Sequence, residues 1–246
     1  MADGIYVSMC GAVARSEQLD AVADNLANVQ TRGFKASRPA FEAFLPAAGG
    51  YDKSYTASVA TALDLRPGPT TSSGNPLDVV PEEGAFLAVR TPAGALAYTR
   101  DGRIEMDARR QLTIAGNVLV SRGDRPIVVP EEYTPEIDPN GQVRGRLHGP
   151  ASGRPDEMVL GEIATFQLAG PVDRVGASLL QPSAGGQALA VDDGRLRVGE
   201  VELGNASALE SAVAMIAAQR SFEASMQAIQ TYRRLDERSV EVGRVR

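Results

Sequence analysis

The sequence predicts an α+β protein in which a long helix at each end of the chain flanks a central antiparallel all-β domain. Three observations support this fold class. Residues 5–30 contain no proline, and residues 207–242 contain neither glycine nor proline. Between about residues 74 and 204, short apolar or β-branched runs alternate with turn signals every 8 to 12 residues or so. We therefore divide the chain into an N-terminal helix with its end motif (1–35), an extended connector (36–73), the β domain (74–202) and a C-terminal helix (203–246).

The first helix carries apolar residues on one narrow face. Leu19, Val22, Leu26 and Val29 follow one another at spacings of three, four and three residues. This spacing is typical of a helix that packs along a second helix. Gly33 follows shortly afterwards, and we expect it to supply the left-handed residue that commonly ends such a helix.

The second helix begins with a capping box, Ser207-Ala208-Leu209-Glu210. The serine hydroxyl can accept a hydrogen bond from the Glu210 amide, and the Glu210 carboxylate can reach back to the Ser207 amide. Numerous alanines in the helix favour helix formation and allow neighbouring helices to approach closely.

The apolar face of the second helix includes Met215, Phe222, Met226 and Ile229, of which the last three lie at positions i, i+4 and i+7. A helix of about 35 residues is roughly 50 Å long, which exceeds the side of a small domain. We therefore expect its apolar face to be buried in a coiled-coil-like bundle of several chains. The alternative is an intramolecular hairpin formed by the two terminal helices.

The central region contains turn residues where tight reversals need them, as in Thr91-Pro92-Ala93-Gly94 and Asp138-Pro139-Asn140-Gly141. The runs between the turns are the candidate strands. They cover residues 86–90, 96–99, 103–106, 111–114, 118–120, 127–129, 142–147, 163–168 and 195–201.

Composition argues against several classes of function. The chain has 25 basic and 31 acidic residues, and it has no basic block interleaved with aromatic residues, so nucleic acid is not expected as a partner. Cys10 is the single cysteine, which excludes an internal disulfide and a cysteine zinc cage. We predict no metal and no cofactor.

Catalytic candidates are few. His148 is the only histidine and lies beside Gly149 and Pro150, a context that favours a surface turn over a catalytic base. The acidic pairs at residues 82–83 and 131–132 could suggest glycosidase chemistry, but adjacent acids on a turn usually point apart into solvent. We predict that the chain is not an enzyme.

Targeting signals are equally sparse. No window reaches the roughly 18 apolar residues of a membrane span, and the first residues lack the basic end and apolar stretch of a cleavable signal peptide. We expect no membrane insertion, and any export should proceed without cleavage.

The residues at the end of the first helix carry a family resemblance. The stretch Asn25-Leu26-Ala27-Asn28-Val29-Gln30-Thr31-Arg32-Gly33-Phe34-Lys35 resembles the N-terminal signature of the flagellar rod and hook proteins. Residues 74–78, 98–102 and 111–113 resemble the entry to the central domain of that family, residues 126–130 its next strand, and residues 215–223 with 229–231 its C-terminal helix. The resemblance covers nearly the whole chain.

The resemblance implies a structural subunit of the flagellar basal-body rod in the periplasm, exported by the flagellar export apparatus and assembled with copies of itself and other rod subunits. Length, the opening residues 4–9 and a single β domain favour a proximal over a distal rod subunit. The implied assembly interface comprises Leu19, Val22, Leu26, Val29, Met215, Phe222, Met226 and Ile229. The implied helix-end motif comprises Asn25, Asn28, Thr31, Gly33, Phe34 and Lys35. We assign capping and chain reversal to Asn25, Asn28, Thr31 and Gly33.

Two other classes of protein would share parts of this pattern. A polysaccharide-acting enzyme would suit the β-rich middle, but it predicts aromatic sugar platforms, and the chain has no tryptophan. A binding module such as an adhesin or a phage-tail component would share the arrangement of helices around a β domain.

Overall fold

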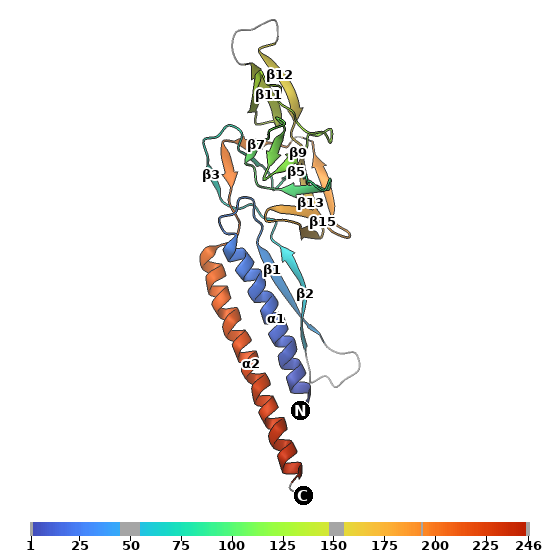
Figure 1. The fold of residues 1–246 in the computed structure, drawn as a ribbon, viewed down its shortest axis with the longest axis vertical. Coiled ribbons are helices and arrows are strands. Elements are labelled where there is room, and N and C mark those ends of the chain that lie inside the picture. The colour runs from blue at the N-terminus through green and yellow to red at the C-terminus, as the bar shows by residue number, and fades with distance from the viewer. Residues whose placement is uncertain (1, 45–54, 148–154, 193, 245–246) are drawn as a thin grey trace. The chain divides into compact units, whose positions relative to one another are not determined.

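The computed structural model describes residues 2–44, 55–147, 155–192 and 194–244 (Figure 1). The chain forms two compact units. The helical unit comprises Met1–Ala27, Ser37–Ala62 and Ala206–Arg246, and the β unit comprises Asn28–Ala36 and Leu63–Asn205. A long helix at each end and antiparallel strands between them confirm the predicted α+β class.

The helical unit is built on a pair of antiparallel helices. Helix α1 (Ala2–Ala27) and helix α2 (Ala208–Arg244) lie side by side, and strands β1 (Ser37–Phe44) and β2 (Tyr55–Leu63) form a two-stranded sheet beside α1 (Figure 1). The intramolecular hairpin, which the sequence left open as an alternative, is therefore the arrangement of the two terminal helices within this chain.

The register of the hairpin is fixed by a close approach of the two helices. A Cβ added to Gly11 would lie 3.7 Å from Ser225 Oγ, so residues 11 and 225 face each other. Because the helices are antiparallel, Ala2 then lies opposite residue 234 or so. The last ten or so residues of α2 extend roughly 15 Å beyond α1 at 1.5 Å per residue.

Small side chains are frequent among the buried residues of the two helices. The buried residues are Ala12, Ala14, Val22 and Asn25 in α1 and Ser211, Ala218 and Ile229 in α2. Alanine and serine allow two helix backbones to approach closely, as the alanine-rich sequence of α2 indicates.

The β unit contains sixteen strands in the part of the chain that the structure describes. They are β3 (Thr70–Ser72), β4 (Val79–Pro81), β5 (Phe86–Arg90), β6 (Leu96–Thr99), β7 (Ile104–Met106), β8 (Leu112–Ile114), β9 (Asn117–Leu119), β10 (Tyr133–Ile137), β11 (Gln142–Leu147), β12 (Glu157–Glu162), β13 (Thr165–Ala169), β14 (Val172–Arg174), β15 (Leu179–Pro182), β16 (Gln187–Val191), β17 (Leu196–Val198) and β18 (Glu200–Glu202).

These strands pair antiparallel in four sheets. The largest sheet has nine strands, with the order β14-β15-β6-β5-β9-β8-β7 and with β13 joining β5 to β16. A three-stranded sheet has the order β10-β11-β12, and the pairs β17-β4 and β18-β3 form two small sheets.

Strand β5 lies between two apolar clusters, which explains its uninterrupted apolar sequence. Leu87 and Val89 face the larger cluster, whereas Phe86 and Ala88 face the smaller one, because successive side chains of a strand point to opposite sides. The larger cluster also takes Tyr133, Ile137 and Val143 from the three-stranded sheet, so the two sheets share one core.

Several strand predictions have the observed bounds, and others need correction. Residues 86–90, 96–99 and 142–147 are strands as predicted. Residues 127–129 are not a strand, because this segment forms only isolated bridges and lies between Pro126 and Pro130, which lack an amide donor. The predicted strand 195–201 is interrupted by Gly199, whose φ of 79° is left-handed, and so divides into β17 and β18.

Candidate functional site

The turn after α1 is made by two residues of the helix-end motif. Helix α1 ends at Ala27. The Thr31 amide then donates to the Asn28 carbonyl at 3.0 Å, and the Thr31 hydroxyl donates to Asn28 Oδ1 at 3.1 Å. Asn28 and Thr31 thus close the turn with one backbone hydrogen bond and one side-chain hydrogen bond.

Asn25 binds the start of strand β1, which belongs to the same helical unit. Its side-chain amide donates to the Ser37 carbonyl at 2.8 Å, and its Oδ1 accepts from the Ser37 amide at 2.7 Å. Asn25 is buried, so these two hydrogen bonds satisfy both polar ends of its side chain. They join the last turn of α1 to the first residue of β1.

Gly33 does not end the helix, contrary to the expectation from the sequence, because α1 stops six residues earlier at Ala27. It is left-handed, with a φ of 66°, and its amide donates to the Glu202 carbonyl at 3.0 Å. A Cβ at this position would lie 2.2 Å from the Asp101 amide nitrogen. Position 33 therefore requires glycine for two reasons. Its backbone is left-handed, and a side chain would collide with the backbone of the β unit.

This geometry predicts a large effect of Gly33→Ala. The left-handed conformation alone costs an alanine about 1–2 kcal/mol, and the clash with Asp101 must add to that cost. Gly74 is a matched control, since its φ is 71° and no atom lies within 4 Å of an added Cβ. Urea unfolding should show a clearly larger loss of stability for Gly33→Ala than for Gly74→Ala, and equal losses would contradict the close-packing explanation.

Phe34 and Lys35 are fully buried in the β unit. The Arg174 guanidinium lies 4.3 Å from the centre of the Phe34 ring, in the position of a cation–π contact, and it also donates to the Lys35 carbonyl. The last two residues of the helix-end motif thus belong to the interior of the β unit.

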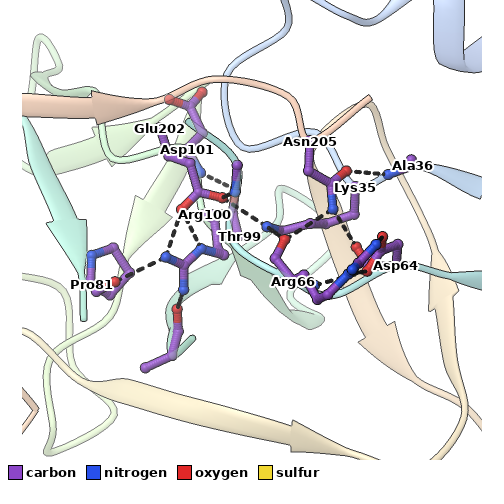
Figure 2. A network of polar contacts seen from close by, with 12 residues as sticks. Lys35, Ala36, Asp64, Arg66, Pro81, Thr99, Arg100, Asp101, Glu202 and Asn205 are labelled. Carbon is purple, nitrogen blue, oxygen red and sulfur yellow. Dashed lines mark hydrogen bonds and ion pairs between the residues drawn. The ribbon is translucent and has the colours of Figure 1, made fainter. Parts of the chain in front are cut away.

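Lys35 reaches a buried ion cluster, which we define as Lys35, Arg100 and Glu202 (Figure 2). Lys35 Nζ donates to Glu202 Oε1 at 2.7 Å, and Arg100 Nε donates to Glu202 Oε2 at 2.6 Å. No side chain of the three is more than 2% exposed. Two cations therefore share one carboxylate out of contact with water.

The remaining polar atoms of the ion cluster are also satisfied. The Arg100 guanidinium donates to the carbonyls of Pro81 and Ala85, and Lys35 Nζ donates to the Arg66 carbonyl at 2.8 Å. Glu202 Oε1 accepts a further hydrogen bond from the Gly68 amide at 2.9 Å. Such complete pairing is what allows charges to stay buried.

Burial and the neighbouring charges shift the pKa values of Lys35 and Glu202. Burial lowers the pKa of Lys35, and the Glu202 carboxylate opposes that shift. Burial by itself would raise the pKa of Glu202, but the hydrogen bond from Arg100 and the charge of Lys35 outweigh it and hold the pKa below its ordinary value. Glu202 is therefore ionised at neutral pH.

Asn205 ties the neighbouring chain segments together. Its side-chain amide donates to the Asp64 carbonyl at 2.7 Å and to the Arg66 carbonyl at 2.9 Å, while its Oδ1 accepts from the Ala36 amide at 2.7 Å (Figure 2). The β unit consists of two chain segments, Asn28–Ala36 and Leu63–Asn205, and residues 36, 64 and 205 lie at or near the ends of these segments. The ion cluster and Asn205 thus fix three of those ends relative to one another.

The predicted assembly residues divide into buried and exposed groups. Val22 and Ile229 are buried, with 6% and 8% exposed surface. Leu19, Leu26, Val29, Met215 and Phe222 are half-buried, and Met226 is exposed. Ile229, which the sequence predicted to be buried by other chains, is thus already buried within the single chain.

Most of the exposed large apolar residues of the hairpin form two patches. The α1 patch comprises Tyr6, Met9, Cys10 and Val13, at positions i, i+3, i+4 and i+7. The α2 patch comprises Leu209, Val213 and Ile216, at positions i, i+4 and i+7. Leu209 is 75% exposed and Tyr6 is 62% exposed. The sequence identified several of these residues as apolar helix positions but did not assign them to the assembly interface.

The start of α2 has half of the predicted capping box. The Glu210 amide donates to the Ser207 hydroxyl at 3.3 Å, and the Ser211 amide donates to the Ser207 carbonyl at 2.9 Å. Glu210 is exposed, and no bond from its carboxylate to the Ser207 amide occurs among the described residues. Ser207 therefore occupies the N-cap position without the reciprocal contact.

The β unit also has a polar cavity of about 430 Å³, lined by Arg122, Asn140, Gln142, Glu162, Asp192, Gly194 and Arg195. Arg122 forms ion pairs with Glu162 and Asp192 at its edge. The acidic pairs at residues 82–83 and 131–132 do not line it. His148, for which the sequence predicted a surface turn, lies outside the described residues.

No described helix is long and apolar enough to cross a membrane. Within the same residues, no group of three or more histidine, cysteine, aspartate or glutamate side chains is arranged to hold a metal ion.

Comparison with protein families gives matches along the chain. Residues 5–35 match the model described as flagella basal body rod protein. Residues 83–145 match that of the flagellar hook protein FlgE/F/G D1 domain, and residues 197–242 match that of the flagellar basal body rod FlgEFG protein C-terminal region. The three matches contain the helix-end motif, most of the larger apolar cluster and most of α2.

Individual relatives align over nearly their whole length. The flagellar basal-body rod protein FlgG of Borreliella burgdorferi is 32% identical over 256 residues, covering 94% of this chain and 95% of the relative. The rod protein FlgF of Escherichia coli is 32% identical over 246 residues, covering 93% of each chain. FlgF of Mesorhizobium japonicum is 30% identical over 228 residues, covering 91% and 90%. The chain therefore belongs to the flagellar basal-body rod protein family.

Proposed function

We propose that this chain is a structural subunit of the proximal part of the flagellar rod and that it catalyses no reaction. Relatives named FlgG and FlgF have similar identities, so the choice of the proximal rod depends on the sequence features that favour it, which are the chain length, the opening residues 4–9 and the single β domain. A distal rod subunit is the alternative within the same family.

The observation that carries the proposal is the exposed apolar surface of the helical hairpin. The α1 patch and the α2 patch place at least six large apolar side chains in water in the single chain. Burial of each such side chain contributes of order 1.5–3 kcal/mol, and repeated contacts of this kind are what an extended assembly of identical chains requires.

The partners in this proposal are copies of the same chain and the neighbouring rod subunits. The terminal helices form a helical bundle in the assembly, and the β unit supplies a surface specific to each kind of subunit. The chain reaches the periplasm through the flagellar export apparatus. Nucleic acid and membrane insertion have no part in this function.

Deletion of the gene tests the function. The deletion strain should be non-motile, and its purified basal bodies should lack a complete rod, because a missing subunit interrupts assembly. Expression of the full-length chain should restore both, and electron microscopy should place the labelled chain at the part of the rod nearest the export apparatus. A deletion strain with complete, rotating flagella would contradict the proposal, whereas a label at the far end of the rod would favour the distal subunit.

A further inference from the structure

The polar cavity of the β unit is walled by four chain segments. They are the loop after β9 at Arg122, the turn from β10 to β11 at residues 140–142, the end of β12 at Glu162, and residues 192, 194 and 195 between β16 and β17. The Arg122 amide donates to the Glu162 carbonyl at 2.9 Å, and Glu162 pairs with Gln142 in the three-stranded sheet. The cavity is therefore a feature of the folded β unit rather than of a single loop.

One part of the cavity wall carries a net negative charge. The Arg122 guanidinium donates to one carboxylate oxygen of Glu162 at 2.9 Å and to one of Asp192. Two carboxylates thus share one guanidinium, which leaves a net charge of −1. Among the described residues, the second oxygen of each carboxylate has no hydrogen-bond partner. These two oxygens can accept hydrogen bonds from a cation.

A second part of the cavity wall carries a positive charge. The Leu196 amide donates to the Pro139 carbonyl at 2.9 Å, which brings the adjacent residues Arg195 and Asn140 close to each other. Neither of these two side chains forms a hydrogen bond or an ion pair within the described part of the chain. The guanidinium offers five N–H donors and the amide two more, so together they can receive a carboxylate.

The cavity has no apolar wall. Apart from Gly194, every lining residue is charged or carries a side-chain amide. Small-molecule sites usually hold an apolar ligand body with hydrophobic and aromatic side chains, and this cavity offers none to such a body. The two arginines and two carboxylates of the lining balance each other in charge. The chemistry that complements this wall is a small polar molecule with one positive and one negative group.

From these observations we propose that the polar cavity binds a small zwitterion, of about the size of a dipeptide, that carries one carboxylate and one ammonium group. Arg195 and Asn140 receive the carboxylate, and the second oxygens of Glu162 and Asp192 receive the ammonium. The volume of about 430 Å³ lies within the usual range for small-molecule sites. All lining residues belong to the β unit, so this binding goes beyond the proposed assembly through the helical hairpin.

Three dipeptides test the proposal with the full-length chain. Alanyl-alanine carries both charges at neutral pH, N-acetyl-alanyl-alanine lacks the ammonium, and alanyl-alanine amide lacks the carboxylate. In a titration followed by amide NMR, alanyl-alanine should shift the resonances of Asn140 and Gly194 saturably, with one site per chain. Each capped dipeptide should bind about fivefold more weakly, because it loses one charge contact in a partly solvated site.

Arg195→Gln tests which residue receives the carboxylate. This variant should bind alanyl-alanine about fivefold more weakly than the wild type and no better than it binds the amide form. Asn140→Ala, at the neighbouring position, should weaken the same contact. Arg125→Gln is the matched control, because Arg125 is an exposed arginine of the same loop as Arg122 but does not line the cavity, so this variant should bind as the wild type does.

Four results would overturn the inference. The absence of a saturable shift at the cavity would exclude the site, and equal affinity for the three dipeptides would show that neither charge is recognised. If the acetylated dipeptide bound as tightly as alanyl-alanine, the cavity would be a site for a carboxylate alone, such as an acidic side chain of another chain. Wild-type affinity in Arg195→Gln would place the ligand elsewhere. The comparison of the three dipeptides uses the wild-type chain, so it does not depend on the folding of any variant.

Discussion

Glu202→Ala is expected to lower the free energy of unfolding of the β unit by about 3–5 kcal/mol, the usual cost of removing one partner from a buried ion pair. The substitution leaves Lys35 and Arg100 as two buried cations without an anion. It also removes the acceptor of the Gly68 amide. Urea denaturation, followed by hydrogen exchange of the amides in the β unit, measures the change.

An exposed ion pair of the same unit provides the control. Arg146 and Glu136 are 3.0 Å apart, and their side chains are 63% and 48% exposed. Because solvent screens such pairs, Glu136→Gln should cost less than about 1 kcal/mol. If Glu202→Ala were as mild as Glu136→Gln, the ion cluster would not be holding the segments of the β unit together.

The same cluster predicts part of the acid sensitivity of the protein. Arg100 and Lys35 hold the pKa of Glu202 below its ordinary value of 4.5 despite burial. The stabilisation from the ionised carboxylate is therefore present at neutral pH and is lost as the pH falls through the lowered, folded-state pKa. Glu202→Ala should lack this component, so wild type and variant should converge in stability in strong acid.

Ile229→Asp is expected to disrupt the helical hairpin, whereas Ile216→Asp should leave it intact. Ile229 is 8% exposed, so an aspartate there must be desolvated without a partner, at a cost of several kcal/mol. Ile216 is 54% exposed, and surface substitutions of this kind usually change stability by less than about 0.5 kcal/mol. Thermal unfolding of the full-length chain, followed by the helical circular dichroism signal, compares the two.

The β unit is an internal reference for this comparison. The hydrogen exchange of its amides should be the same in both variants if the effect of Ile229→Asp is confined to the helical unit. Equal helix stability of the two variants would show that Ile229 is not buried in the hairpin of the free chain.

Much of the fold could be predicted from local sequence. Long segments without proline gave the two helices, and the turn chemistry around Gly94 and Gly141, both left-handed with hydrogen-bonded turns, placed strands β5, β6 and β11. Strands β14 to β16 were missed, because their short, mixed sequences lack a clear two-residue alternation. Their pairing depends on distant partners, as where β15 joins β6.

The ion cluster could not be predicted, because Glu202 and Arg100 are charged residues in or beside strands, which local patterns place in water. Lys35 was selected only by the family resemblance. Their partnership joins residues 35, 100 and 202, and no spacing rule connects positions so far apart. The sequence placed Lys35 in the helix-end motif but gave no sign that its side chain is buried.

The helix faces show a different limit of sequence reasoning. A three- and four-residue spacing identifies an apolar face but does not say whether the face meets the same chain or another copy. On α2, the face with Ile229 meets α1, and the face with Val213 and Ile216 is exposed. Only the structure of the hairpin shows which face of α2 contacts α1 and which face is exposed.

The central claim is that the exposed patches of the hairpin build the rod, and Ile216→Asp tests it most directly. The measurement is the amount of this variant in basal bodies purified from a strain that lacks the wild-type gene. We predict that the full-length variant is produced with normal helix content but is absent from basal bodies, and that the cells are non-motile. Incorporation at the wild-type level, with normal swimming, would contradict the claim.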